Sequence, residues 1–318
     1  MNDWRPSAPA EAARRRARLL DRARQYFSRH EVLAVDTPVL GRATVTDPNI
    51  DSLQCDDGRF LQTSPEYFMK RLLAAGYPDI YSIGPVFRRN EHGSRHLSQF
   101  TMVEWYRLGF GLDAIVRDAV ALIATLLRRE GVDAERHDYA TLFEERLGID
   151  PLVASLRELQ RAAGADAELI DTMGERRDAW LDLLMATRIA ATLPADRLSV
   201  VQHYPASQAA LARRCPHDPR VADRFEVFCG TMELANGYVE LTDPVEQAER
   251  MRADAAARRA SGKAEVDPDQ RLLHALEAGL PACAGVALGL ERVQMIADGS
   301  GNIRDVVTFV EERDDDRL

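Results

Sequence analysis

Residues 80–110, IYSIGPVFRRNEHGSRHLSQFTMVEWYRLGF, decide the fold class. Runs rich in β-branched and aromatic residues stand at both ends of this stretch, and they predict two strands separated by a charged loop at Arg88–Ser98. Similar strand signals return at Leu198–His203, Arg224–Phe228 and Met232–Val239. Runs of strands with helices outside them, rather than a regular alternation, predict an α+β fold built on an antiparallel β-sheet flanked by helices.

The residues before this stretch predict a helix, a short strand, a hairpin and a second helix. Apolar residues recur at roughly helical spacing among the arginines of Ala10–His30, as in an amphipathic helix. Val32–Val35 is strand-like, and Leu53–Leu61 predicts a hairpin around a turn that contains a glycine. Ser64-Pro65 is expected to start the second helix, with serine as its cap and proline in its first position.

The residues after the stretch predict further helices around two more strands. Asp113–Leu193 is mostly helical in pattern, and nothing in it suggests chemistry. Asp243–Gly262 predicts a charged helix that begins at an Asp-Pro pair. A glycine-rich strand is expected at Ala284–Leu288, followed by a helix from Leu290 and a last strand at Val306–Val310.

Length and charge exclude several classes of protein. The 318 residues suffice for one large domain, and no repeat or linker divides them. The chain lacks both an apolar run of roughly 18 residues, which a membrane span needs, and the apolar core of a secretory signal. We therefore expect a cytoplasmic protein without membrane contact. The net charge of −10 argues against a protein whose main task is to grip nucleic acid.

Lysine chemistry is almost excluded, because only Lys70 and Lys263 are lysines among the 41 basic residues. Gly262-Lys263-Ala264 lacks the hydroxyl residue of a phosphate-binding P-loop, so ATP would have to be bound by another fold. One concentrated basic surface is conceivable at Arg14–Arg29, which otherwise reads as a solvated helix in an arginine-rich chain.

The cysteines give no clear site. Cys55, Cys215, Cys229 and Cys283 lie far apart in the chain, and no two of them form a C-x-x-C pair. The cysteine spacing therefore indicates neither a zinc site nor a redox motif, and we expect buried, reduced thiols.

Three segments place arginines and carboxylates on strands or strand ends, where a rigid scaffold can aim them. They are Phe87–Tyr106, Glu226–Glu240 and Gly285–Arg292. Alternate strand residues share a face, so Asn236, Tyr238 and Glu240 are expected to point the same way. Each segment alone could equally hold ordinary surface ion pairs.

Taken in order, these residues resemble the signature motifs of class II aminoacyl-tRNA synthetases, and most closely the lysyl-type catalytic domain. The segments that carry the resemblance are the helix and strand ending at Pro38, Thr63–Tyr67, Phe87–Arg88 with Phe100–Tyr106, Glu233–Leu241 and Gly285–Arg292. The likeness extends from about Arg16 to Val310. It implies an ATP-dependent, AMP-forming ligase with a fold of the α+β class already expected.

The truncated lysyl-tRNA synthetase paralogues are the most similar members. Ala43–Asp47, Tyr204–Gln208 and Gly285–Gly289 resemble these paralogues rather than the full synthetases, and Ala287 replaces a glycine usual in the latter. The first motif ends near residue 38, which leaves no room before it for an anticodon-binding domain. We therefore expect residues 1–318 to form one catalytic domain, with residues of about 113–193 as a helical region.

The resemblance implies a reaction with ATP, Mg²⁺ and a lysine-like amino acid. The acid, (R)-β-lysine or lysine, would be activated as an adenylate and passed to a lysine side chain of elongation factor P, with release of pyrophosphate and AMP. The family also implies a homodimer with Arg16–Pro38 at its interface and, for these paralogues, no tRNA partner. Two alternatives stay open: a freestanding ligase of the same type with another acceptor, and a degenerate binding subunit.

Roles for individual residues follow from the resemblance. Arg88 would hold the α-phosphate and the substrate carboxylate, and Arg292 the γ-phosphate, with the adenine between Arg292 and Phe100; these two arginines are the catalytic candidates. The remaining residues expected at ATP are Arg89, Asn90, Glu91, His96, Leu97, Glu233, Leu234 and Gly289. The metal ligands would be Glu226 and Glu233. The residues expected at the amino acid are Ser64, Pro65, Glu66, Glu104, Tyr106, Asn236, Tyr238, Glu240 and Ala287.

The sequence departs from the family at the adenine. Arg89-Asn90-Glu91 stands where synthetases usually have Asn-Glu, so the carboxylate that reads the adenine edge is either Glu91 or absent. Leu97-Ser98-Gln99 replaces the expected Asn-Pro-Glu and removes a polar contact. His96 keeps its expected place, although a lone loop histidine could equally be a solvated residue.

Overall fold

The fold is built on one eight-stranded sheet. The computed structural model describes residues 4–129 and 134–310. The strands follow one another across the sheet in the order β1-β4-β5-β10-β9-β8-β7-β6. Their bounds are Leu33–Ala34 (β1), Ile80–Phe87 (β4), Gln99–Leu108 (β5), Cys283–Gly289 (β10), Met232–Val239 (β9), Arg224–Cys229 (β8), Leu198–Gln202 (β7) and Glu135–Asp138 (β6). Only the outermost pairs, β1 with β4 and β6 with β7, are parallel, so the predicted α+β class with a mainly antiparallel sheet is confirmed.

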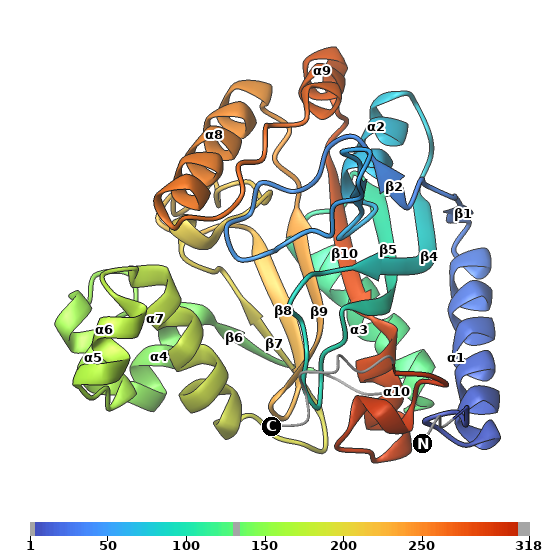
Figure 1. Ribbon diagram of the computed structural model, residues 1–318, viewed down its shortest axis with the longest axis horizontal. Helices are drawn as coiled ribbons and strands as arrows, with labels where there is room; N and C mark the ends of the chain where they lie inside the picture. The colour runs from blue at the N-terminus through green and yellow to red at the C-terminus, as the bar shows by residue number, and fades with distance from the viewer. Residues whose placement is uncertain (1–3, 130–133, 311–318) are drawn as a thin grey trace.

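Three helices cover one face of this sheet: α1 (Ala10–Arg29), α3 (Leu112–Leu127) and α10 (Leu290–Asp298). Figure 1 shows α1 as a long helix along one side of the molecule, and α3 and α10 near the lower ends of the central strands. Their buried residues, such as Phe27 and Val293, join strand residues such as Trp105 in the largest apolar core. The side chains of helix and sheet therefore interlock over most of that face.

Three of the seven arginines of helix α1 hold it to the rest of the molecule. Arg15 bonds Asp298, Arg22 donates to a backbone carbonyl, and Arg16 contacts both Glu291 and Thr101. These contacts fasten α1 to α10 and β5. Arg14, Arg18, Arg24 and Arg29 are exposed, as expected for the solvated helix that the sequence predicted.

A second group of helices packs around its own core beside β7. It comprises α4 (Tyr139–Leu147), α5 (Leu156–Ala163), α6 (Ala167–Met173) and α7 (Arg177–Leu184). Trp180 and Phe143 are fully buried in this core, which also includes Val201 of β7. Figure 1 shows the group set to one side of the sheet. The strand β6 also lies in this region, where the sequence predicted a mostly helical pattern and no strand was named.

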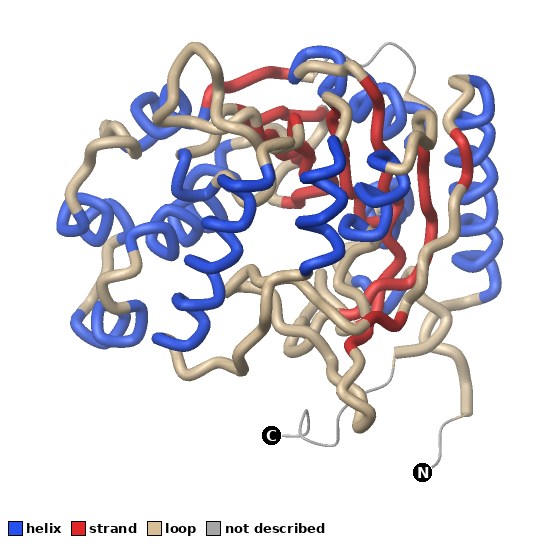
Figure 2. The backbone as a smooth tube through the Cα atoms, turned by 90° about the horizontal axis from the view of Figure 1, so that it is seen from above, coloured by secondary structure: helices blue, strands red, loops and turns tan. Residues whose placement is uncertain are grey.

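The third group, α2 (Glu66–Ala74), α8 (Pro244–Ala260) and α9 (Gln270–Gly279), lies near the upper ends of the strands in Figure 1. Leu73 and Leu272 belong to its core, which it shares with Ile80 and Tyr106 of the sheet. Seen from above in Figure 2, helices flank the strands on both sides. In the part of the chain that the structure describes, no helix is long and apolar enough to cross a membrane.

Two local predictions differ from the structure. The strand expected at Val306–Val310 is wrong: a 3₁₀ turn at Ile303–Asp305 precedes it, and the segment makes only isolated bonds with Ser7. Ile303 and Val306 are buried in the core, so their burial, not strand pairing, explains the apolar pattern. The predicted hairpin at Leu53–Leu61 exists as backbone bonds, but its returning strand, β3 (Phe60–Leu61), pairs mainly with β2 (Leu40–Gly41).

Candidate active site

The strand register sets two rows of functional side chains side by side. Glu104 of β5 lies opposite Ala287 of β10, which lies opposite Asn236 of β9, which lies opposite Glu226 of β8. The neighbouring row, two residues along each strand, holds Tyr106, Gly285, Tyr238 and Arg224. Residues two apart on a strand point to the same face, so both rows face one side of the sheet.

These rows form the floor of a cavity of about 860 Å³. Most of the residues expected from the sequence line this cavity, although they come from distant parts of the chain. They are Ser64, Glu66, Arg88, Glu91, His96, Leu97, Phe100, Glu104, Tyr106, Glu226, Glu233, Leu234, Asn236, Tyr238, Glu240, Ala287, Gly289 and Arg292.

Three expected residues do not line the cavity. The backbone of Arg89 pairs with Asp51, and Asn90 is exposed with a positive φ of 64°. This turn of the chain carries both side chains away from the cavity, whereas Glu91 returns to its wall. Pro65 stands at the start of α2 and contributes backbone, while Ser64 Oγ accepts a hydrogen bond from Glu66 N at 2.9 Å.

One end of the cavity holds a buried carboxylate that two hydroxyl groups orient. Ser64 Oγ and Tyr106 Oη each donate to Glu104 at 2.7 Å. Burial, followed by the charge of Glu66, raises the pKa of Glu104 to about 8. At neutral pH this carboxyl therefore holds a proton for much of the time, and a cation beside it would favour the ionised form.

The same end contains a lysine that the sequence analysis left without a role. Lys70 Nζ lies 2.6 Å from Glu66 Oε1 and 2.6 Å from Glu240 Oε2, and its side chain is only 2% exposed. Although burial opposes the charge, Glu240 and Glu66 raise the pKa of Lys70 above its usual value. The pair Glu66 and Lys70 at i and i+4 of α2 is a signal that could have been read as a helical ion pair.

Charge balance at this end favours a cationic ligand. With Glu104 ionised, three carboxylates face one ammonium group, so the cluster carries an excess of two negative charges. Burial also raises the pKa of Glu240, in spite of Lys70. Buried carboxylates in excess are costly until a counter-charge arrives, and a ligand with two ammonium groups would supply it.

A glycine allows this cluster to pack against the sheet. A Cβ atom on Gly285 would lie 2.4 Å from Tyr106 Cε1 and 2.7 Å from Glu240 Oε1. Both contacts are far closer than packed atoms tolerate. The strand therefore needs glycine at this position so that the Tyr106 ring can reach Glu104.

The other end contains two arginines, Arg88 and Arg292, each with a carboxylate 3.5 Å away. Arg88 lies over the Phe100 ring, with its guanidinium carbon 5.2 Å from the ring centroid, and its Nη1 is 3.5 Å from Glu91 Oε1. Arg88 directly follows β4 and Phe100 lies near the start of β5, so they stand on either side of the charged loop, as the sequence predicted. Their guanidinium and aromatic faces can serve a planar ring and phosphate oxygens.

Arg292 lies at the start of α10 and contacts two neighbouring elements. Its Nη1 donates to the carbonyl of Glu233 at 3.0 Å, and its Nη2 lies 2.6 Å from His96 Nε2. Burial and then the charge of Arg292 lower the pKa of His96, so the imidazole is a neutral acceptor at neutral pH. His96 therefore lines the cavity while its side chain stays exposed to solvent.

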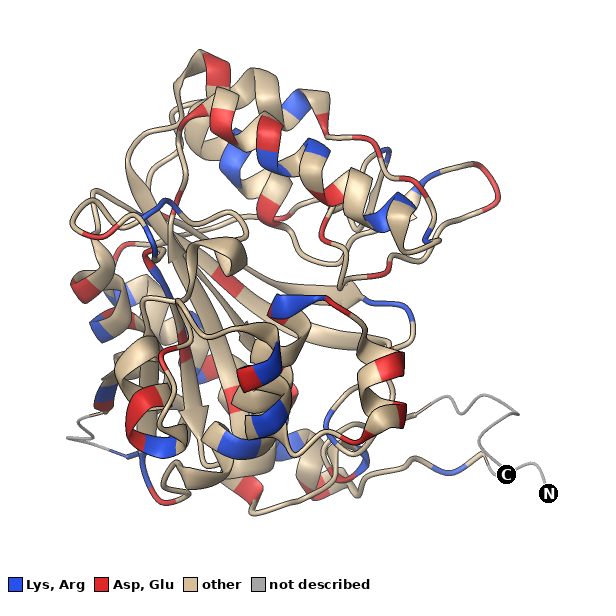
Figure 3. Ribbon diagram, turned by 90° about the vertical axis from the view of Figure 1, so that its left-hand side faces the viewer, with Lys and Arg blue, Asp and Glu red and all other residues tan. Residues whose placement is uncertain are grey.

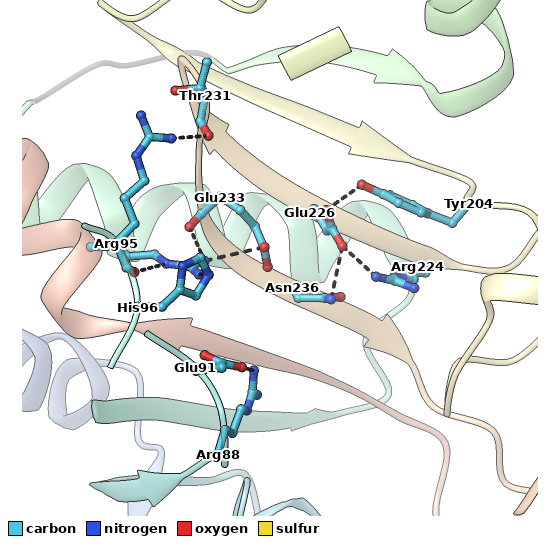
Figure 4. A network of polar contacts seen from close by, with 11 residues as sticks. Arg88, Glu91, Arg95, His96, Tyr204, Arg224, Glu226, Thr231, Glu233 and Asn236 are labelled. Atoms are coloured by element: carbon cyan, nitrogen blue, oxygen red, sulfur yellow. Dashed lines mark hydrogen bonds and ion pairs between the residues drawn. The ribbon is translucent and has the colours of Figure 1, made fainter. Parts of the chain in front are cut away.

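Three side chains donate hydrogen bonds to the carboxylate of Glu226. It accepts from Tyr204 Oη at 2.7 Å, from Arg224 Nη2 at 2.6 Å and from Asn236 Nδ2 at 3.2 Å. Figure 4 shows these three side chains converging on Glu226, with Glu233 to one side near His96. Burial and the nearby charge of Glu233 raise the pKa of Glu226. Arg224 and Tyr204 are site residues that sequence reasoning missed as individuals, although Tyr204–Gln208 was singled out as a segment.

Oxygen donors for a hard divalent cation gather at this point. Glu226 and Glu233 lie on adjacent strands and line the cavity. Among the described residues, the Oδ1 of Asn236 is buried without a hydrogen-bond partner, so it is a further acceptor awaiting a donor or a cation. Carboxylate and amide oxygens are the ligands that Mg²⁺ prefers, and this donor set fits it.

The helical region forms part of the wall, although the sequence indicated no chemistry in it. Asp182 of α7 accepts from Gln208 Nε2 at 2.7 Å, and Asp178 accepts from Ser207 Oγ at 2.7 Å. Burial raises the pKa of Asp182 to about 6. Figure 3, which views this side of the molecule, shows acidic and basic residues interspersed along the helices. The Tyr204–Gln208 segment is therefore tied to α7 at the cavity.

Comparison with known proteins gives consistent matches over nearly the whole chain. The family described as tRNA synthetases class II (D, K and N) matches residues 1–313. The chain is 43% identical to the elongation factor P–(R)-β-lysine ligase of Vibrio cholerae, over 97% of this chain and 98% of that protein. It is 42% identical to the protein of that name from Pseudoalteromonas translucida, also over 97% and 98%. The corresponding protein of Klebsiella pneumoniae is 40% identical over 98% of both chains.

Proposed function

Because the chain belongs to the class II tRNA synthetase family (D, K and N), and within it to the elongation factor P–(R)-β-lysine ligases, we propose that it is an ATP-dependent ligase that attaches (R)-β-lysine to a lysine side chain of elongation factor P. The observation that carries the proposal is the division of charge along one cavity. Carboxylates in excess occupy the end with Glu104, and Arg88 and Arg292 occupy the other. A diamine acid and a nucleoside triphosphate fit these ends respectively.

The first step joins the two substrates. An oxygen of the β-lysine carboxylate attacks the α-phosphorus of ATP, the new P–O bond forms, and the bond to the pyrophosphate leaving group breaks. The carboxylate is ionised at neutral pH, so the enzyme needs no general base and contributes chiefly positioning and charge neutralisation. Arg88, which can donate two parallel hydrogen bonds, would hold the α-phosphate and the carboxylate together.

Other residues at the nucleotide end would bind without reacting. Arg292 would bond the γ-phosphate, with neutral His96 keeping its guanidinium in place. The adenine would lie between Arg292 and Phe100. It would then cover part of the Phe100 ring face that Arg88 contacts in this structure. Of the segment Arg89-Asn90-Glu91, only Glu91 lines the cavity. Its carboxylate would therefore be the group of this segment that reads the adenine edge.

Magnesium fits the oxygen donors at the middle of the cavity. Glu226 and Glu233 would hold it, and the bound ion would neutralise phosphate charge during the first step. Arg224 and Tyr204 keep the Glu226 carboxylate in a fixed orientation through hydrogen bonds of 2.6 and 2.7 Å. This arrangement leaves the carboxylate ready to bind without a change of rotamer.

The amino-acid end would select the substrate. Glu66, Glu104 and Glu240 would accept the two ammonium groups, while Ser64, Tyr106 and Tyr238 shape the wall. Ala287 lies between Glu104 and Asn236 in the strand register, in the middle of the floor. A methyl group at this point restricts which lysine isomer fits, because one methylene in a pocket changes affinity by about 1–3 kcal/mol.

The second step transfers the acyl group to the acceptor. The amine of the target lysine attacks the carbonyl carbon of the adenylate, an amide bond forms, AMP leaves, and the amine loses a proton. We place this reaction in the cytoplasm, where translation factors act, and assign the whole chain to one catalytic domain that works without tRNA. A homodimer would bury the exposed Leu33, which lies just after α1.

An exchange experiment tests the proposal. The purified protein is incubated with ATP, radiolabelled pyrophosphate and each isomer of lysine, with and without elongation factor P. Exchange should be strongest with (R)-β-lysine, and label from the amino acid should become bound to elongation factor P. In Ala287→Gly, the preference should move toward α-lysine by roughly tenfold or more. Absence of exchange with every isomer would refute adenylate formation. Exchange without transfer of the amino acid to elongation factor P would refute that factor as the acceptor.

A further inference from the structure

Three potential metal ligands of different chemistry meet outside the cavity. One ligand atom each from His203, Cys215 and Asp223 lies within 4.8 Å of the other two. None of the three lines the cavity, and the proposed ligase reaction uses none of them. They lie 12 and 8 positions apart along the chain, a spacing that matches no short metal-binding motif, so the sequence analysis expected no metal site at the cysteines.

Backbone pairing brings the three together. The segment 221–224 lies between two others: His203 N donates to the carbonyl of Arg224 at 3.0 Å, and Cys215 N donates to the carbonyl of Val221 at 2.9 Å. His203 and Cys215 therefore approach Asp223 from opposite flanks. The cluster closes the base of the long loop between β7 and β8, and its position is fixed by hydrogen bonds rather than by chance contact of side chains.

The histidine ring is already oriented for a ligand. Asp138 Oδ1 of β6 lies 2.6 Å from His203 Nδ1 and also accepts from Gln202 Nε2 at 3.2 Å. A carboxylate on Nδ1 fixes the proton there and leaves Nε2 as the free electron pair. This carboxylate–histidine arrangement is the usual support for a metal-bound imidazole.

Asp223 is held in the same way. Its residue is 4% exposed, and Arg213 Nε donates to its Oδ2 at 2.8 Å. The bond from Arg213 goes to Oδ2 and not to the second oxygen, Oδ1. Arg213 thus fixes the carboxylate and leaves one oxygen for a ligand. Cys215, a free cysteine, is partly buried beside it.

We propose that His203, Cys215 and Asp223 bind a divalent transition-metal ion, with Zn²⁺ as the best fit and water as a fourth ligand. Nitrogen and thiolate ligands favour Zn²⁺ over Mg²⁺ or Ca²⁺, which take oxygen alone. A tetrahedral zinc ion with bonds of about 2.0–2.3 Å needs ligand atoms about 3.3–3.8 Å apart, so side-chain adjustments of about 1 Å complete the site. The cysteine loses its proton to the solvent when the metal binds.

Metal binding would stiffen one wall of the cavity. The loop that the cluster closes carries Tyr204 and Gln208, and the residue after Asp223 is Arg224. These three residues hold Glu226 and α7 in place through hydrogen bonds. A metal ion at the base of the loop would therefore stabilise the wall without touching either substrate, and the site does not depend on the reaction proposed above.

The test uses Co²⁺ as a spectroscopic probe of the full-length protein after removal of metals with a chelator. One equivalent of Co²⁺ should produce a thiolate-to-cobalt charge-transfer band, and one equivalent of Zn²⁺ should abolish it. Cys215→Ser should remove the band, and His203→Gln should weaken Zn²⁺ binding at least tenfold. Asp138→Asn, which loses the orienting carboxylate, should weaken it by about 10–100-fold. Cys55→Ser, at a cysteine remote in the chain, is the matched control and should behave as the wild type.

Alkylation provides a second measurement that needs no variant to fold. Zn²⁺ should protect Cys215 of the wild-type protein from iodoacetamide, as judged by peptide mass spectrometry, while Cys55 stays equally reactive. The glutamates of the cavity cannot imitate either signal, because they offer no thiolate. A protein that gives no charge-transfer band with Co²⁺ and no protection of Cys215 by Zn²⁺ would overturn the proposal, as would a band that survives in Cys215→Ser.

Discussion

Glu104 connects substrate binding to pH at the scale of a single residue. Its pKa is raised to about 8 by burial and by Glu66, so the free enzyme holds a proton there at pH 7. The ammonium groups of (R)-β-lysine stay protonated and favour the carboxylate, so binding should expel that proton. Affinity should therefore rise with pH between about 6 and 8, by up to tenfold per unit, and level off above pH 8.

Calorimetry can count this proton. Titrations at pH 7 in two buffers with different ionisation enthalpies should show proton release on binding of (R)-β-lysine. Glu104→Gln, which cannot ionise, should release fewer protons and show a flatter pH profile. Binding of equal strength at pH 6 and pH 8 in the wild-type protein would contradict the assignment of a protonated Glu104.

Lys70 is the residue whose loss should harm stability most directly. Lys70→Met leaves Glu66 and Glu240 buried without their cation, and breaking a buried pair in this way costs about 3–5 kcal/mol. The loss should shrink at pH 5, because burial raises the pKa of Glu240 and this carboxylate then takes up a proton more readily. Urea unfolding at the two pH values measures it.

The only other lysine, Lys263, supplies a matched control. It pairs with Asp51 at 3.1 Å, but its side chain is 34% exposed. Lys263→Met should therefore change the free energy of unfolding by less than about 1 kcal/mol. Equal losses in the two variants would mean that burial does not govern the Lys70 pairs.

At the scale of elements, the junction between β10 and α10 aims one arginine. Gly289 ends the strand and caps the helix, and Arg292 follows in the first turn of α10. Because its proposed role is contact with phosphate, Arg292→Ala should lower pyrophosphate exchange by about 10²–10³-fold. The melting temperature should change little, since the side chain is partly exposed and its backbone partners are two carbonyls, of Glu233 in β9 and of Arg95 in the charged loop.

A helical arginine away from the cavity provides the comparison. Arg271→Ala, in the first turn of α9, should leave exchange as in the wild type. Exchange that stays normal in Arg292→Ala would show that another group holds the γ-phosphate. A large drop in melting temperature would instead assign Arg292 a structural role.

Elements were predictable where a single strand or helix carries its own signal. The alternation along β9 correctly indicated that Asn236 and Tyr238 share a face, because that periodicity is local. The helix α9 was missed although its sequence carries a signal, an Asp269 cap followed by Leu272, Leu273 and Leu276 at helical spacing. The edge strand β6 was missed because its four residues are polar and mostly exposed, so only pairing with β7 makes them a strand. The last strand was predicted wrongly because burial of Val306 imitates a strand pattern.

The residues of the site also fall into those that the sequence could predict and those that it could not. Motif order in the sequence identified Arg88, Glu226 and Arg292, which the structure brings to one cavity. Sequence order could not place Lys70 or Arg224 there, because decisive partners of each lie on other elements. Lys70 pairs with Glu240, and Arg224 donates to the carbonyl of Gln208 and lies over the Tyr204 ring. The same holds for Asp182, which reaches the cavity only through the packing of α7 against the loop after β7.

At the scale of the whole molecule, the proposed homodimer requires an apolar surface near α1. Leu33 and Val39 are each 45% exposed, and both lie close after that helix in the chain. Such a surface faces its own copy across a two-fold axis, so each substitution enters the interface twice. The double variant Leu33→Glu/Val39→Glu should therefore weaken the dimer strongly, by more than about tenfold in its dissociation constant, because it sets like charges in an apolar contact.

Sedimentation over a range of concentrations measures the effect. The wild-type protein should sediment with twice the chain mass of 35.5 kDa at micromolar concentration, and the double variant should shift toward the monomer. Val153→Glu changes an apolar residue that is 71% exposed and lies in the helical region, so it should leave the dimer intact. A wild-type chain that stays monomeric throughout, or a Val153→Glu variant that dissociates equally, would place the apolar surface of Leu33 and Val39 outside any dimer contact.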